Sequence, residues 1–336
     1  MGERKKIEII QILRLFGAIC IIIYHSGIVG EHGYFAVDIF SVLSGYILMY
    51  STQSSQTKVG FLRKRLVRIV PLYWAMTLFI YVILLYKPEL SLMAEAKPEY
   101  LIKSLLFIPF INGKGYDVPI LGLGWTLNYE VAFYLIFWLA MRISHRNRGL
   151  AAISGIVMLI VFNLLLGGRY FILDYYADSF LLEFAFGIGA YYFIDRMKAH
   201  ADKPTVKYGL SVAAVISLVW MMLDVGVGSS VERCFRLGIP AVILFVALMV
   251  ECGEKHFAPT LVKLGNATFS IYLIEYFSTA LYKLIAPGKG VVVQGILFSV
   301  MLFGTLAVGY LTYYLVEQKL GERLKRIIVP RNQRRE

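Results

Sequence analysis

The chain has 336 residues, of which 58% are hydrophobic and only 17% are charged, and its mean hydropathy is +0.67. Soluble domains average roughly 45–50% apolar and about 25% charged residues. The composition therefore excludes a soluble enzyme, a disordered protein and a nucleic-acid-binding domain. It favours an all-α, polytopic integral membrane bundle, because a helix satisfies its own backbone hydrogen bonds in lipid.

Ten apolar runs predict membrane-spanning helices, since about 17–25 residues cross the hydrocarbon core. The first run follows three cations, as a signal peptide does, but Arg14 interrupts it and no small-residue cleavage site follows, so we expect it to remain uncleaved. In chain order the predicted spans are about 7–26, 34–50, 69–86, 125–141, 150–166, 178–194, 208–225, 234–250, 268–285 and 291–316.

The loops between these runs carry an uneven distribution of Lys and Arg. With the amino terminus on one side, that side holds 24 of the 34 cations and the opposite side holds 9. Cytoplasmic loops carry the excess of Lys and Arg, so both termini are predicted to be cytoplasmic. Residues 1–320 would form the transmembrane domain and 321–336 a basic cytoplasmic tail. The outer segment 87–124 contains an apolar stretch, 100–110, that suggests a short interfacial or re-entrant helix.

Ionisable side chains inside the predicted spans are the main candidates for function, because each costs about 2.5–3.5 kcal/mol at mid-membrane. Arg14 and His25 are eleven residues apart in the first span, about three helical turns, so both face the same way. A structural interpretation stays open, in which the Arg side chain extends to the inner surface and His25 caps the helix at the interface.

Two carboxylates are expected at the same depth as His25. Asp38 and Glu130 each come early in a span that begins on the outer side. A carboxylate beside a His fixes its tautomer and stabilises the imidazolium, as general-base catalysis requires. The alternative is that both carboxylates only favour the positive ends of their helices. For Glu183 and Glu275, in the sixth and ninth spans, structural pairing and function are both open.

The inner end of the third span carries a pair of arginines. Arg65 and Arg68 are three residues apart and therefore neighbours on one helix face. Guanidinium groups bind phosphate in a bidentate manner, so this pair suits a phosphorylated ligand. The alternative is the ordinary positive charge that flanks a span on its cytoplasmic side.

Four motifs in chain order contain these residues: Arg14-x10-His25; Gly33-Tyr34-Phe35-x-Val37-Asp38-Ile39-Phe40-x-Val42-Leu43-Ser44-Gly45-Tyr46; Phe61-x3-Arg65-x2-Arg68-Ile69-x-Pro71-Leu72-Tyr73-Trp74; and Gly124-Trp125-Thr126-Leu127-Asn128-Tyr129-Glu130-x2-Phe133-Tyr134. Together they resemble the membrane-bound acyltransferase family three, the O-acyltransferases of bacterial envelopes. The residues Trp125 to Glu130 of the fourth motif are similar to those of the exopolysaccharide acetyltransferase branch.

The resemblance implies an O-acetyltransferase with ten core helices in the bacterial cytoplasmic (inner) membrane. It implies acetyl-CoA as donor co-substrate, and a hydroxyl of an extracytoplasmic polysaccharide or lipid-linked glycan as acceptor. It also implies that Arg14 and His25 are essential. The chain departs from the family pattern at Glu275, where members often carry a His. No tightly bound cofactor and no metal site is expected, and the three cysteines form no CxxC pair.

In the resulting hypothesis, His25 is the general base, Asp38 or Glu130 orients its imidazole, and the pantetheine arm passes Arg14. Direct transfer and an acyl-enzyme intermediate are both open. The alternatives are a proton-coupled membrane transporter, which also uses intramembrane charges, and a non-catalytic scaffold. The expected substrate or CoA contacts are Arg65, Arg68, Tyr73, Trp74, Trp125, Asn128, Tyr134 and Glu275.

Overall fold

Helices form all the regular structure in the described part of the chain, which confirms the all-α prediction. This computed structural model describes residues 7–321 and 323, apart from 31, 55–59 and 225–228. The predicted tail, 321–336, lies almost wholly outside the described residues. The chain divides into two compact units, residues 1–50 with 183–314 and residues 51–182 with 315–336, and each is described by itself.

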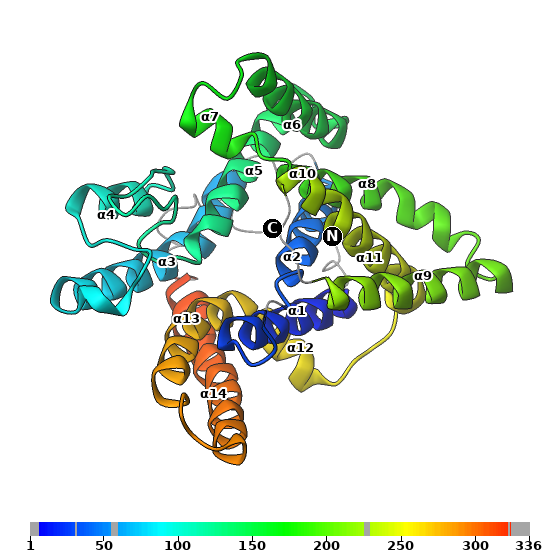
Figure 1. The fold of residues 1–336 in the computed structure, drawn as a ribbon. Helices are drawn as coiled ribbons and strands as arrows, with labels where there is room; N and C mark the ends of the chain where they lie inside the picture. The colour runs from blue at the N-terminus through cyan, green and yellow to red at the C-terminus, as the bar shows by residue number, and fades with distance from the viewer. Residues whose placement is uncertain (1–6, 31, 55–59, 225–228, 322, 324–336) are drawn as a thin grey trace. The chain divides into compact units, whose positions relative to one another are not determined.

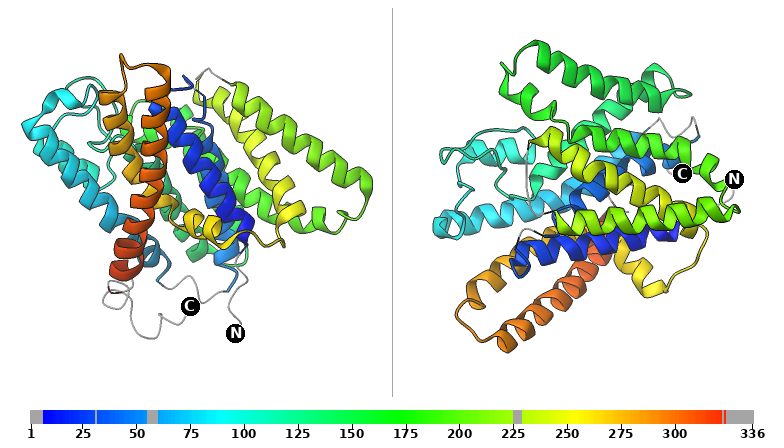
Figure 2. Two further views of the ribbon diagram at one scale, coloured as in Figure 1. Left: turned by 90° about the horizontal axis from the view of Figure 1, so that it is seen from below. Right: turned by 45° about the vertical axis from the view of Figure 1, so that its right-hand side comes forward.

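The first unit contains most of the long apolar helices. In it α1 packs against α12 and α13, α13 against α14, and α9 against α11, as Figures 1 and 2 show. A π-helical segment, η3, joins α10 to α11. The elements are α1 (Glu8–Ser26), α2 (Ala36–Ser51), α8 (Leu181–Lys198), α9 (Pro204–Leu223), α10 (Ser230–Arg233), η3 (Cys234–Gly238), α11 (Ile239–Cys252), α12 (Pro259–Asn266), α13 (Thr268–Ile285) and α14 (Val291–Thr312).

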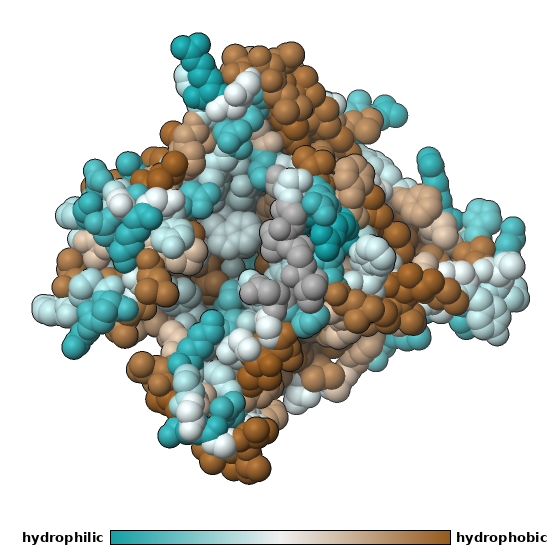
Figure 3. All heavy atoms as spheres, viewed as in Figure 1, coloured by the Kyte–Doolittle hydropathy of each residue, from teal (hydrophilic) through white to brown (hydrophobic). Residues whose placement is uncertain are grey.

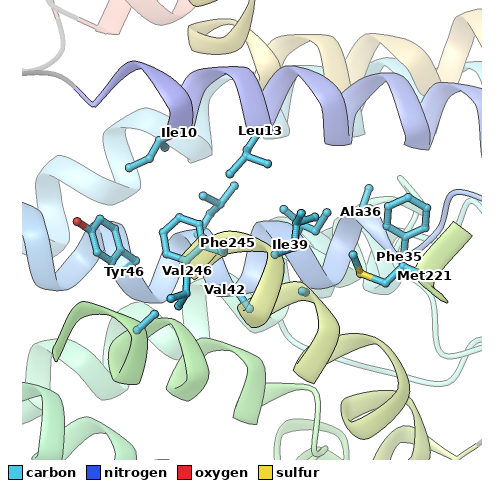
Figure 4. Close-up of a cluster of buried hydrophobic side chains, with 14 of the residues drawn as sticks. Ile10, Leu13, Phe35, Ala36, Ile39, Val42, Tyr46, Met221, Phe245 and Val246 are labelled. Atoms are coloured by element: carbon cyan, nitrogen blue, oxygen red, sulfur yellow. The ribbon is translucent and has the colours of Figure 1, made fainter. Parts of the chain in front are cut away.

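The core of the first unit lies where α1, α2, α9 and α11 meet. Leu13 of α1, Ile39 and Val42 of α2, Met221 of α9 and Phe245 of α11 are all buried in one cluster (Figure 4). Ile39 and Val42 are three residues apart on α2, which is the spacing of one helix face. The cluster holds the helices that carry the polar residues described below.

The second unit is built on α3, which packs against both α4 and α5, while α5 packs against α6. The aromatic end of the third motif ties α4 to α3. Tyr73 donates a hydrogen bond to the carbonyl of Ser104, and Trp74 donates one to that of Leu105. The elements are α3 (Phe61–Tyr86), η2 (Pro88–Leu90), α4 (Pro98–Leu105), α5 (Gly124–Ile143), α6 (Arg148–Leu165), α7 (Phe171–Tyr176) and the π-helix η4 (Tyr313–Leu320), which continues from α14.

Seven helices within the described residues are long and apolar enough to cross a membrane. In Figure 3 apolar side chains gather as brown patches over α6 and α14, and large side chains such as Leu165 and Phe303 are exposed there. Soluble proteins rarely expose apolar patches of this kind, whereas a membrane protein buries them in lipid. The chain is therefore a multi-pass membrane protein. A helix lies in each of the ten predicted ranges. Three of these helices are not among the seven: α2, which has only 16 residues, α5 and α13. The count of ten spans therefore stays a prediction.

Candidate active site

The first candidate residue, His25, lies in the last turn of α1. The helix ends there because Gly27 takes the left-handed conformation, with φ 77°, and its N–H bonds to the carbonyl of Tyr24. Glycine adopts this conformation without steric cost and commonly ends helices. The imidazole lies beside the Tyr24 ring, with centroids 5.0 Å apart, and its side chain is 30% exposed.

A buried carboxylate holds one nitrogen of this imidazole. Nδ1 of His25 lies 2.8 Å from Oε1 of Glu275 on α13, whose side chain is 1% exposed. Among the described residues, none forms a hydrogen bond with Nε2. With Glu275 ionised and His25 neutral, Nδ1 donates to the carboxylate, which only accepts hydrogen bonds, and Nε2 carries the lone pair. In that state the pair presents a proton acceptor.

Two hydroxyl side chains lie one turn after Glu275 on α13. The Thr279 hydroxyl bonds to the backbone carbonyl of Glu275 at 2.7 Å and lies 3.4 Å from its Oε2. Ser278 bonds to Thr305 of α14 at 2.6 Å. These contacts fix the turn that carries the carboxylate, which in turn orients His25.

Arg14 shares the helix face of His25, as the eleven-residue spacing predicts. Its Nη1 lies 3.4 Å from Oε1 of Gln11, one turn earlier on α1. The side chain is half-buried. The essential role implied for Arg14 stays a prediction.

Asp38 has a different partner from the one expected. Nε and Nη2 of Arg233 donate to its two carboxylate oxygens, each at 3.0 Å, and Asp38 is 0% exposed. Because both oxygens are held by one guanidinium, Asp38 is not the carboxylate that orients His25. Glu275, which was expected to contact substrate, fills that place instead.

In the second unit Glu130 belongs to a chain of contacts that reaches Arg65. The Tyr134 hydroxyl donates to Glu130, one turn earlier on α5. The Arg65 guanidinium lies over the Tyr134 ring, 5.8 Å from its centroid, and donates to the Ser51 hydroxyl at 2.7 Å. Arg68 follows one turn later on α3. Glu130 and Tyr134 are thus brought together, and Arg65 is oriented by both an aromatic ring and a hydroxyl.

The other residues of the third and fourth motifs lie among aromatic rings. Tyr73 is fully buried and anchors α4, so its own side chain is closed to a ligand in this arrangement. Trp125 lies 5.6 Å from Phe180 between ring centroids, and the Asn128 amide donates to the Tyr175 hydroxyl at 3.3 Å. Trp74 is 41% exposed. Contacts of these residues with substrate stay predictions.

Sequence reasoning missed Arg233, which it left in an outer loop without a role. The signal in the sequence that could have pointed to Arg233 is charge balance, because a buried Asp38 requires a cation as partner. With 34 Lys and Arg in the chain, that requirement does not select a partner 195 positions away.

Comparisons with known proteins identify the class. The family model described as an acyltransferase domain matches residues 7–314, so the chain belongs to this acyltransferase family, as the four motifs indicated. Exopolysaccharide production protein ExoZ of Rhizobium meliloti (strain 1021) is 29% identical over 313 residues, which cover 89% of this chain and 92% of that protein. Acyltransferase MdmB of Streptomyces mycarofaciens is 31% identical over 120 residues, 34% of this chain and 30% of that protein. No solved structure matches the chain significantly.

Proposed function

We propose that this membrane acyltransferase moves an acetyl group from cytoplasmic acetyl-CoA to a hydroxyl of an extracytoplasmic polysaccharide or lipid-linked glycan. The observation that carries the proposal is the pair of His25 and Glu275, 2.8 Å apart, with Nε2 of the imidazole open. The similarity to a protein named for exopolysaccharide production supports a glycan acceptor. Family membership favours acyl transfer over the transporter and scaffold alternatives.

The open nitrogen sets the chemistry of the transfer. The acceptor hydroxyl donates its proton to Nε2 of His25 while its oxygen attacks the thioester carbonyl, so that a C–O bond forms. The C–S bond then breaks, and the departing CoA thiolate takes the proton from the imidazolium. Glu275 stabilises the imidazolium between these steps. General-base catalysis of this kind contributes roughly 10²–10⁴ in rate.

Arg65 and Arg68 would hold the phosphates of CoA at the cytoplasmic end of α3. Arg65 is oriented by Ser51 and by the ring of Tyr134, and an oriented guanidinium loses less freedom when it binds phosphate. The bias of 24 cations to 9 supports a cytoplasmic location for this end of α3 and for both termini.

The orientation is tested by labelling single cysteines in a background without Cys20, Cys234 and Cys252. A membrane-impermeant thiol reagent added outside intact cells should modify a cysteine at Asp117 and spare one at Lys203. Permeabilised cells, in which both positions react, provide the control. The reverse pattern would place the donor on the other side of the membrane.

The reaction is tested with purified protein in liposomes. Supplied with radiolabelled acetyl-CoA and envelope glycan, it should release CoA thiol and label the glycan, whereas His25→Ala liposomes should do neither. In cells, polysaccharide from a deletion strain should lack an acetyl-sized mass that the restored gene returns. Thiol release without a labelled glycan would reject the acceptor, and no thiol release would reject the donor.

A further inference from the structure

A second carboxyl group is buried beside the pair of Asp38 and Arg233, and the acyl-transfer mechanism does not use it. Glu183, near the start of α8, is 0% exposed. Within the described residues, neither of its carboxylate oxygens accepts a hydrogen bond from a donor group. Burying an ionised carboxylate without donors costs several kcal/mol, so the protonation state of this side chain requires an explanation.

The carboxyl of Asp38 lies within hydrogen-bonding reach of the Glu183 carboxyl. Arg233 faces both carboxyls, and Cys234 also lies close to Glu183. The Asp38 oxygens are 3.0 Å from Nε and Nη2 of Arg233. The cluster thus contains two carboxyl groups and one guanidinium. Two adjacent carboxylates do not both stay ionised, and an excess negative charge is especially costly in a membrane interior.

The backbone of the two helices prevents the carboxyls from moving apart. A Cβ at Gly45 of α2 would lie 2.1 Å from the carbonyl oxygen of Phe184, and one at Gly187 of α8 would lie 2.0 Å from that of Val42. The two helices therefore touch backbone to backbone. Val42 and Gly187 each lie one turn after the carboxyl on their own helix, so this crossing fixes the carboxyls side by side.

We propose that Glu183 is a protonated carboxylic acid that donates a hydrogen bond to Asp38. Its O–H and the two N–H groups of Arg233 then all point at one ionised carboxylate, and the three side chains together carry no net charge. Glu183 is a positioning residue that joins α8 to α2 and to the segment before α11. The proposal holds whether or not the chain transfers acetyl groups.

Infrared spectroscopy tests the proton directly. A protonated carboxyl has a C=O stretching band, sensitive to deuterium exchange, that a carboxylate lacks. Purified wild-type protein should show this band for a buried acid, and Glu183→Gln should lose it. Glu254→Gln, which changes an exposed carboxyl with a side chain 84% exposed, is the matched control and should keep it. A spectrum in which Glu183→Gln removes no acid band would overturn the proposal.

Thermal unfolding in detergent tests the hydrogen bond. Glu183→Gln should melt close to wild type, because the amide N–H₂ can donate to Asp38 as the acid does. Glu183→Leu keeps a similar volume but has no donor, and should melt at a clearly lower temperature or fail to accumulate. Equal losses for Gln and Leu, or no loss for either, would contradict the proposal. The infrared comparison requires only the Gln variant, so it stands even if the Leu variant does not fold.

Discussion

Glu275 and Asp38 are both fully buried carboxylates in the first unit, yet their partners give them different chemistry. Glu275 holds one nitrogen of an imidazole and leaves the other open. Asp38 has both oxygens bound by the guanidinium of Arg233, which does not give up its proton. The first pair can accept and return a proton, whereas the second can only hold helices together. The partner therefore decides whether a buried acid leaves a nitrogen open beside it or holds two helices together.

Removing the open nitrogen should have the largest effect. His25→Gln and His25→Ala are both expected to lower acetyl transfer roughly 10²–10⁴-fold, because neither side chain accepts a proton at neutral pH. Initial rates of CoA release from purified protein measure this.

The control for His25 is the amount of folded protein in the membrane, which should not change. If His25→Gln transferred acetyl groups at nearly the wild-type rate, His25 would only cap α1. The base would then have to be sought elsewhere, first at Glu130.

Neutralising the two carboxylates one at a time should separate rate from stability. Glu275→Gln should reduce the rate about 10²-fold, because a neutral amide does not stabilise the imidazolium as a carboxylate does, and should change the melting temperature little. Asp38→Asn removes the carboxylate that Arg233 holds and leaves the Glu183 carboxyl to balance the guanidinium charge, so this variant should melt at a lower temperature than wild type. Melting curves and rates measured on both variants test the comparison, and an Asp38→Asn protein with wild-type stability would contradict it.

Changing both Arg65 and Arg68 to Gln should have a smaller effect, confined to the donor. Each charge-assisted hydrogen bond contributes about 1.5–3 kcal/mol, so the KM for acetyl-CoA should rise while the KM for the acceptor stays constant. Lys203→Gln, on another predicted cytoplasmic loop, is the control. An unchanged KM for acetyl-CoA would mean that the two arginines serve only to set topology.

The smallest effect is expected outside the spans, at Glu95 and Lys97. Their side chains are 2.8 Å apart, and the hydrogen bond from Lys97 lowers the pKa of Glu95 while that of Lys97 rises. This ion pair therefore stabilises the fold at pH values above the ordinary pKa of a carboxyl, and the stabilisation is lost as the pH falls through the lowered pKa of Glu95. Glu95→Gln should have a slightly lower melting temperature than wild type at neutral pH and the same melting temperature in acid. Equal melting at neutral pH would contradict this.

Each of the ten ranges predicted from apolar runs contains a helix, because hydrophobicity is a local property that lipid selects along the chain. The short helix α4, Pro98–Leu105, was likewise signalled by an apolar stretch that begins beside a proline. The shared face of Arg14 and His25 follows from helical spacing alone. These features depend only on neighbouring residues, so they are readable in the sequence.

The amino-acid sequence is enough to predict the membrane class, the helices and His25 as a candidate base. Which carboxylate lies beside His25 depends on how the helices pack. Depth along a helix placed Asp38 level with His25, but the pairing with Glu275 joins residues 250 positions apart. The rotation of each helix about its own axis selects such a partner, and that rotation is fixed by packing against several helices at once.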